Sequence, residues 1–281
     1  MLFRSCGKLT LAFVLDSLTF FASAMLIASV SFPHRPKRVK SKLTVGKALG
    51  ITETIEGARY VNHRPRVLAY LLVKTAWGMG GGILTLLAVF GEKIYPVAGK
   101  GATGIGVLFT ARGIGTAVGP FVARRWAGET RSQMQNAIGI GFLIGGVFYF
   151  AFGVGHSFIF ALLFLAIAHA GGSILWVFST VLLQRATEDQ FRGRVFAAEL
   201  GLATLTMAAS NYVVGELMER FGFSPRVVTA GVGTFFLMPG LIWFFTQKWW
   251  DRKEKSVPPA AAKEVTVEQV ATALETEHFE I

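Results

Sequence analysis

Residues 158–184 read FIFALLFLAIAHAGGSILWVFSTVLLQ, a run of 27 residues with no Asp, Glu, Lys or Arg. A helix of about 20 apolar residues crosses the roughly 30 Å hydrocarbon core of a bilayer. The run lacks the strict apolar–polar alternation that a strand of a transmembrane β-barrel requires. This stretch therefore predicts a transmembrane helix.

Similar apolar runs recur along the chain. They cover residues 9–32, 67–90, 103–123, 136–153, 195–218 and 227–247. Each is long enough to cross a membrane as a helix, and none alternates like a barrel strand. We predict an all-α, polytopic membrane protein with about seven transmembrane helices.

Composition supports this class. The 281 residues are 52% apolar and 16% charged, and 32 of them are Gly. Soluble domains carry about 25% charged residues, so a soluble globular or disordered chain is excluded. The formal net charge of +11 comes from 28 Lys and Arg against 17 Asp and Glu.

The basic residues are unevenly shared between alternate loops. Residues 33–66, 124–134, 185–194 and 248–281 hold 20 Lys and Arg, whereas residues 1–8, 91–102, 154–157 and 219–226 hold 6. Basic loops stay in the cytoplasm, so we expect a cell-membrane protein with its N-terminus outside and its C-terminus in the cytoplasm. The basic charge then needs no nucleic-acid partner, and membrane lipids are the expected surroundings.

Four regions follow from this pattern. Residues 1–32 form the first transmembrane helix; a cleavable signal peptide is the alternative, but the apolar run is long and basic residues follow it. Residues 33–66 form a basic cytoplasmic linker with an amphipathic helix at 44–62. Residues 67–247 form a six-helix bundle. Residues 248–281 form a mostly disordered cytoplasmic tail.

Ionisable residues inside the predicted spans are candidates for function because they are costly in a membrane. They are Asp16, Lys74, Arg112, His169 and Glu199. Arg112 fits either a cavity-lining cation, including one that partners a titrating acid, or a structural ion pair. His169 fits a titrating group or, as the favoured interpretation, a hydrogen bond across a helix crossing. Glu199 lies three turns from Asn211 and could face one cavity with it, but a cytoplasmic loop network is the favoured interpretation.

Glycines interrupt the second run. Gly78, Gly80, Gly81 and Gly82 lie within five residues of one another. Clustered Gly weakens a membrane helix and allows close helix approach. These residues are candidate hinges, with a packing role as the alternative.

No enzyme signature is present. The sequence contains no HExxH, CxxC or GxSxG motif, and each of these carries a specific catalytic chemistry. The single Cys6 allows neither an internal disulfide nor a multi-cysteine metal site. We expect no catalytic residues, no metal and no cofactor.

Two stretches resemble a known family. Residues 104–106, 113–115 and 119–125 (GPFVARR) resemble the eighth helix and following loop of the major facilitator superfamily, and residues 184–195 (QRATEDQFRGRV) are similar to its link between helices ten and eleven. The branch most similar is the bacterial exporters that include enterobactin and macrolide efflux permeases. Residues 15–20 are similar to helix six of that branch. One departure is Ala123, which stands where the family pattern has Asp.

The resemblance implies a chain that begins at helix six of a twelve-helix transporter. Such a transporter binds its small-molecule substrate between two six-helix halves. The missing half would come from another polypeptide or a second copy, or the reading frame is truncated at its start; truncation is favoured.

The implied function is secondary active efflux of small organic molecules, coupled to protons. Lys74, Trp77 and Arg112 would line the cavity, and His169 and Asn211 would be polar cavity or packing residues. Cytoplasmic bracing would fall to Gly119, Arg124, Arg192 and Arg194. The alternative is a non-transporting membrane fragment that binds a partner protein.

Overall fold

The computed structural model describes residues 2–30, 51–128 and 130–256, and all regular secondary structure in these ranges is helical. The chain divides into two units, residues 1–48 and 49–281. The described part of the first unit consists of helix α1 (Leu2–Ser29). The prediction of an all-α chain is confirmed.

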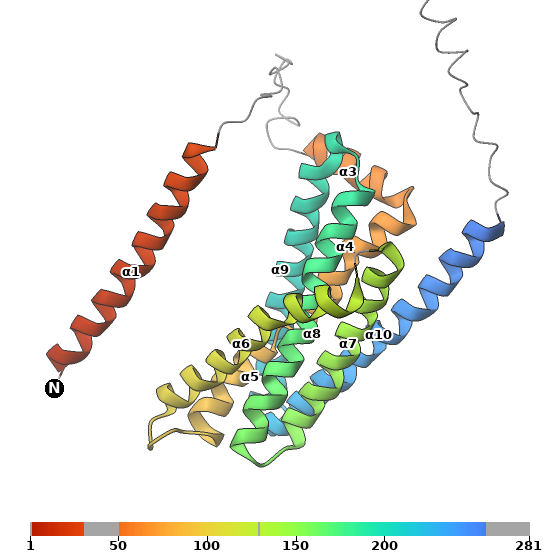
Figure 1. Ribbon diagram of the computed structural model, residues 1–281. Helices are drawn as coiled ribbons and strands as arrows, with labels where there is room; N and C mark the ends of the chain where they lie inside the picture. Colours follow the sequence, from red (N-terminus) through yellow and green to blue (C-terminus); the bar gives the residue numbers. More distant parts are fainter. Residues whose placement is uncertain (1, 31–50, 129, 257–281) are drawn as a thin grey trace, which may run out of the picture. The chain divides into compact units, whose positions relative to one another are not determined.

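The second unit is a helical bundle (Figure 1). Its helices are α3 (Ile51–Asn62), α4 (Pro65–Gly78), α5 (Ile83–Val89), the π-helix η1 (Phe90–Ile94), α6 (Gly101–Ala127), α7 (Arg131–Val154), α8 (Phe158–Ala186), α9 (Asp189–Glu219) and α10 (Pro225–Ser256). The α8–α9 connection lies at the same end of the bundle as α3, and the α7–α8 connection lies at the opposite end.

Five helical segments among the described residues are long and apolar enough to cross a membrane. They are Pro65–Ile94, Gly101–Trp126, Arg131–Val154, Phe158–Ala186 and Pro225–Gln247. They match five of the predicted spans. Helix α9, at the sixth predicted span, has the length but is not among the five, and the apolar part of α1 is shorter. The count of seven crossings stays a prediction.

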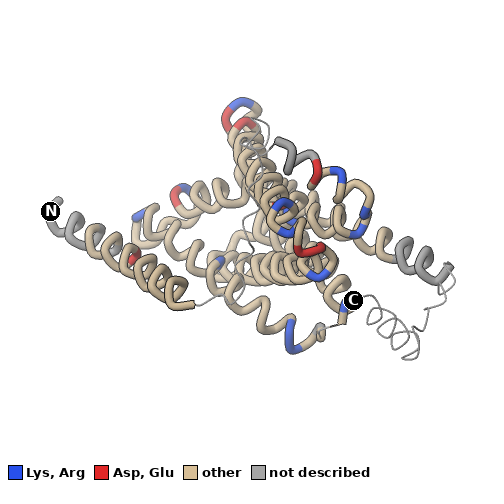
Figure 2. The backbone as a smooth tube through the Cα atoms, turned by 90° about the horizontal axis from the view of Figure 1, so that it is seen from above, with Lys and Arg blue, Asp and Glu red and all other residues tan. Residues whose placement is uncertain are grey.

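The surface of the bundle has the character of a protein surrounded by lipid. Large apolar side chains face outward, such as Trp126 at 86% and Phe121 at 78% exposure. Exposed apolar surface on this scale marks a membrane or a partner. Most of each long helix carries no charge (Figure 2). The chain is therefore a polytopic membrane protein.

Local sequence explains several helix boundaries. Pro65 occupies the first turn of α4, where its missing N–H is no loss. Thr130 and Gln133 form a reciprocal capping box at the start of α7, which satisfies two orphan backbone donors. After α6 the chain turns at Gly128, whose φ of 77° favours glycine.

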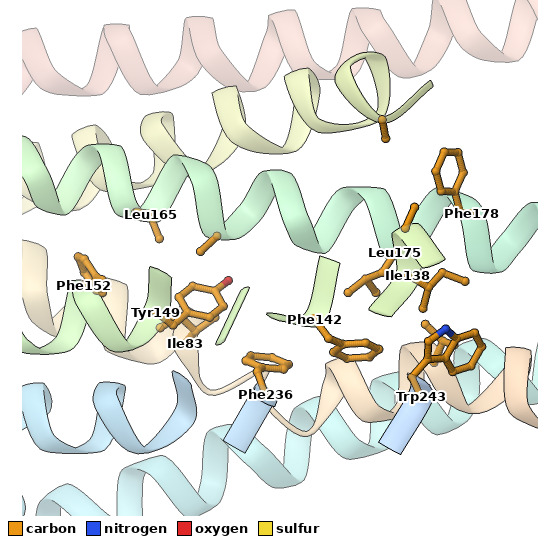
Figure 3. Close-up of a cluster of buried hydrophobic side chains, with 14 of the residues drawn as sticks. Ile83, Ile138, Phe142, Tyr149, Phe152, Leu165, Leu175, Phe178, Phe236 and Trp243 are labelled. Atoms are coloured by element: carbon orange, nitrogen blue, oxygen red, sulfur yellow. The ribbon is translucent and has the colours of Figure 1, made fainter. Parts of the chain in front are cut away.

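The core lies where α7 packs against α8 and α10, while α6 packs on α8 and α4 on α8 and α9. Its buried side chains include Ile138, Phe142, Tyr149, Leu165, Leu175, Phe236 and Trp243 (Figure 3). A Cβ atom on Gly141 would lie 2.7 Å from the carbonyl oxygen of Gly171. Because Gly141 and Gly171 have no side chains, the backbones of α7 and α8 approach each other closely at this point.

The structure differs from the prediction for the tail, and it describes only part of the predicted linker. Helix α10 continues to Ser256, so residues 248–256, predicted to belong to a mostly disordered tail, are helical. The Lys, Trp, Arg and Glu residues there are adequate helix formers. Helix α3 confirms residues 51–62 of the predicted amphipathic helix. The predictions for residues 31–50 and 257–281 lie outside the described residues.

Candidate functional site

The predicted break in the second span is present. Helix α4 ends at Gly78 and α5 begins at Ile83. Between them Gly80 N–H donates to the carbonyl of Trp77 (3.0 Å) and Gly81 N–H to that of Gly78 (2.8 Å). These i to i−3 bonds are those of a 3₁₀ turn, which in the middle of a helix often marks a functional position.

The glycines at the break also face other helices. An added Cβ on Gly80 would overlap the ring of Phe236, and one on Gly81 would overlap Met207. On Gly82 it would overlap the side chain of Val214, and on Gly78 the carbonyl oxygen of Ala203 lies 2.6 Å away. Close packing therefore accounts for these glycines, and a hinge role remains a prediction.

Polar residues of α9 bond to the interrupted segment. Ser210 Oγ accepts from Gly82 N–H at 2.9 Å, and Thr206 Oγ1 donates to the carbonyl of Thr75 at 3.1 Å. Thr85 Oγ1 donates to Asn211 Oδ1 at 2.7 Å. Irregular backbone at membrane depth requires such partners. Asn211 thus joins α5 to α9.

A cavity of about 350 Å³ opens at this break. Its lining comes from α4 and α5, from α6, from α8 and from Met207 of α9, and includes Trp77, Gly80, Gly81, Arg112, Thr116, His169, Ser173 and Trp176. Ligand cavities usually span about 300–1,000 Å³ and combine apolar walls with a few polar groups. This cavity has that size and character.

The predicted residues Trp77, Arg112 and His169 meet in this cavity. They come from three different helices and are separated by up to 92 positions in the chain. The Arg112 guanidinium lies 6.0 Å from the centre of the Phe109 ring, and its buried Nε makes no hydrogen bond to a described residue. The structural ion pair considered for Arg112 is not formed with any described residue.

His169 and Trp77 are held by neighbouring rings. His169 Nε2 lies 2.9 Å from the Tyr149 hydroxyl in a buried hydrogen bond. This is the helix-crossing bond favoured from the sequence, and His169 lines the cavity as well. Trp77 stacks on Phe236 at 4.7 Å between ring centres. Figure 3 shows Tyr149 and Phe236 within the same aromatic cluster.

Lys74 is not among the residues that line this cavity, and its predicted role in a central cavity stays a prediction. Its ammonium is 3.0 Å from Glu199 Oε2, donates to Thr180 Oγ1 at 2.8 Å, and lies 4.7 Å from the centre of the Trp176 ring. Glu199 is 2% exposed. The prediction of a cytoplasmic loop network for Glu199 is therefore wrong, because the carboxylate faces into the bundle.

Two further cavities are described. One of about 540 Å³ lies between α9 and α10, and nearly all of its lining residues are apolar. Another of about 670 Å³ lies between α3, α4 and α9 and includes Arg194. Neither of these cavities combines a position at the helix break with a charged side chain that lacks an ion-pair partner among the described residues. The 350 Å³ cavity does, so it is the candidate site.

The predicted bracing residues have different neighbours. Arg194 forms an ion pair with Glu56 at 2.8 Å and so ties α9 to α3. Arg192 pairs with Asp189 within α9 at 2.9 Å. Arg124 lies in the last turn of α6. A Cβ on Gly119 would overlap the Ala170 carbonyl oxygen and the Ser173 hydroxyl, so this glycine sets the α6–α8 approach.

A second link at this end was not predicted. Arg64 pairs with Glu188 at 2.6 Å, and Tyr60 Oη accepts hydrogen bonds from Arg64 (2.7 Å) and Glu188 N–H (3.0 Å). Tyr60 also stacks on Phe191 at 4.1 Å. The hydrogen bond from Arg64 holds the pKa of the Glu188 carboxyl below its ordinary value.

Several residues of the site carry little signal in the sequence. Trp176, Tyr149 and Phe236 read as ordinary apolar residues of long spans. Trp176 is seven positions from His169, or two helical turns, which places both on one face of α8. That spacing was the available signal.

Within the described ranges, no three His, Cys, Asp or Glu residues gather in a way that would hold a metal ion. No protein-family model, curated protein or solved structure matches this chain.

Proposed function

We propose that this chain is part of a secondary active transporter that exports small organic molecules across the cell membrane, driven by the proton gradient. The observation that carries the proposal is the cavity at the α4–α5 interruption, where Arg112 and His169 meet Trp77. In the proposed orientation the N-terminus lies outside and the α8–α9 turn lies in the cytoplasm, as the distribution of basic residues favours.

The interrupted helix supports this proposal. A lipid-facing break would leave backbone groups without partners, so breaks persist where they are buried in protein or line a cavity. In secondary transporters, discontinuous helices flank the substrate site near the bilayer midplane. Here the break is bonded to α9 and borders the cavity, which supports a substrate site at this position.

The arrangement of the lining supports a two-part transporter. The cavity takes residues from α4, α5, α6, α8 and α9, and none from α7 or α10. The candidate site thus lies to one side of the α7–α10 pair. The resemblance to the major facilitator superfamily implies a second six-helix half over such a site, from another polypeptide or from a second copy.

Energised transport tests the proposal. Everted membrane vesicles from bacteria expressing the full chain are given anionic, neutral and cationic amphipathic fluorescent dyes in turn. We expect transport of at least one dye above vesicles without the protein, abolished by a protonophore. Absence of energised transport for all three dyes would contradict transport by this chain, alone or as copies of itself.

A blocking variant ties transport to the cavity. Thr116 lines the cavity from α6, and Thr116→Trp should reduce transport at least tenfold at equal expression. Thr110→Trp is the matched control, since Thr110 is also exposed on α6 and bonds to its own helix in the same way, but does not line the cavity. Equal transport by both variants would place the substrate elsewhere. A stable complex with another membrane protein and no transport would favour the partner-binding alternative.

A further inference from the structure

Arg112 gives the cavity an uncompensated positive charge. It is the one formally charged side chain in the described lining, and its buried Nε lacks a hydrogen-bond partner among the described residues. The residue as a whole is half-buried. An unpaired cation inside a membrane span is costly, and a bound anion would lower that cost.

The neighbouring ion pair does not offset this charge. Trp176 lines the cavity, and Lys74 lies 4.7 Å from the centre of its ring. Lys74 is itself neutralised by Glu199 at 3.0 Å. The pair has no net charge, so the lining keeps the charge of Arg112.

The other walls favour an aromatic molecule. Trp77 and Trp176 present indole rings, and Trp77 is fixed by its stacking on Phe236. The hydroxyl groups of Thr116 and Ser173 each donate to a backbone carbonyl of their own helix at 3.0 Å, so the charged donor for an anion is the guanidinium of Arg112. A guanidinium recognises a planar carboxylate through two parallel hydrogen bonds, and the volume of about 350 Å³ accommodates one or two fused rings.

We propose that this cavity binds a small aromatic carboxylate, with Arg112 at the carboxylate and Trp77 and Trp176 against the ring. The inference rests on the proposed function for its role in transport, and it makes aromatic anions the substrate class. Binding itself is measurable without transport.

Three probes of one shape and different charge test the proposal. They are 1-naphthoate, neutral 1-naphthalenemethanol and cationic 1-naphthylmethylammonium, each titrated into the purified full chain in lipid nanodiscs by calorimetry at neutral pH. We expect saturable binding of the carboxylate at least tenfold tighter than that of the cation. Equal affinity for all three, or no saturable binding of the carboxylate, overturns the proposal. Absence of saturable carboxylate binding is also expected if an acidic side chain of a second copy pairs with Arg112, and the proposal is overturned in that case too.

Substitutions identify the charge responsible. Arg112→Gln should weaken naphthoate binding at least tenfold and change binding of the neutral probe less than twofold, which also shows that the cavity is intact. Arg112→Lys should keep the preference for the anion with lower affinity. Arg220→Gln, at an exposed arginine of the α9 end, is the control and should leave all three affinities unchanged. Unchanged naphthoate binding by Arg112→Gln overturns the proposal.

The outcomes separate this inference from transport. Energised transport of a cationic dye without naphthoate binding would leave the proposed function in place and overturn the anion site. Naphthoate binding without transport of any dye would support the anion site and contradict the proposed transport by this chain.

Discussion

The Lys74 ammonium lies 3.0 Å from the Glu199 carboxylate, and the two side chains are 7% and 2% exposed. They join α4 to α9 across 125 positions of sequence. The Lys74 bond to Thr180 adds α8 to the junction, while Glu199 Oε1 is buried without a described partner. The ion pair therefore sits where three helices meet.

Removing one member of this ion pair should destabilise the protein more than replacing both members by apolar residues. Glu199→Leu or Lys74→Met alone leaves a buried charge without its partner, a loss of about 3–5 kcal/mol. The double variant removes both charges and should recover most of that loss. Denaturant unfolding of the four proteins in detergent micelles measures the coupling. Strictly additive losses would show that the pair does not act as a unit.

Two glycines of α6 should respond oppositely to alanine. Gly119→Ala places a methyl group against the Ala170 backbone of α8 and should destabilise the bundle by about 1–3 kcal/mol. Gly113→Ala meets no atom within 4 Å and should stabilise by up to about 1 kcal/mol through helix propensity. The unfolding midpoints of both variants test this contrast. Similar shifts for the two would mean that α6 does not approach α8 at Gly119.

The buried bond between Tyr149 and His169 should contribute to stability. Tyr149→Phe removes the hydroxyl and leaves His169 Nε2 unpaired, at a cost of about 1–3 kcal/mol. The double variant with His169→Leu should cost less than the sum of the single changes. The same unfolding assay measures this. If Tyr149→Phe leaves the free energy of unfolding unchanged, water or another group replaces the hydroxyl.

The Arg64–Glu188 link should weaken in acid. Its hydrogen bond lowers the folded-state pKa of Glu188. The stabilisation is present above the ordinary pKa of Glu and is lost as pH falls through the lowered value. Hydrogen exchange of residues 60–66 should rise in that range. Glu188→Gln should remove this dependence, and an identical rise in the variant would assign it to another group.

The orientation can be read by labelling. In a Cys6→Ser background, His156→Cys places one thiol at an exposed position of the α7–α8 connection, and Gln190→Cys places one at an exposed position of the first turn of α9. An impermeant maleimide should label position 156 in intact cells and position 190 only after permeabilisation. The opposite order would reverse the orientation derived from the basic loops.

The helices were the most predictable part of the structure. Residues 158–184 fall within α8, and the runs at 67–90, 103–123, 136–153 and 227–247 fall within the other segments able to cross a membrane. The reason is local: apolar length decides whether a segment enters the bilayer, and hydrogen bonding within the segment decides that it is a helix. The break at Gly78–Gly82 followed from composition in the same way.

The partners of polar side chains were less predictable. Arg112 and His169 stand out in the sequence because charge and imidazole are costly in a membrane, and the structure brings both to one cavity. Lys74 stands out for the same reason but is neutralised by Glu199. Burial cost identifies a residue as unusual; it does not say which helix supplies its partner.

The sequence by itself determined which segments are helical and apolar, where the second span breaks, and that the basic residues gather in alternate loops. Each of these features depends on neighbouring residues or on the number of basic residues in a loop. Only the tertiary structure decided that Glu199 neutralises Lys74, while Arg112, beside Trp77 and Trp176, has no ion-pair partner among the described residues. That outcome depends on how α4, α6, α8 and α9 rotate and approach one another, because packing between distant segments sets the electrostatics of the cavity.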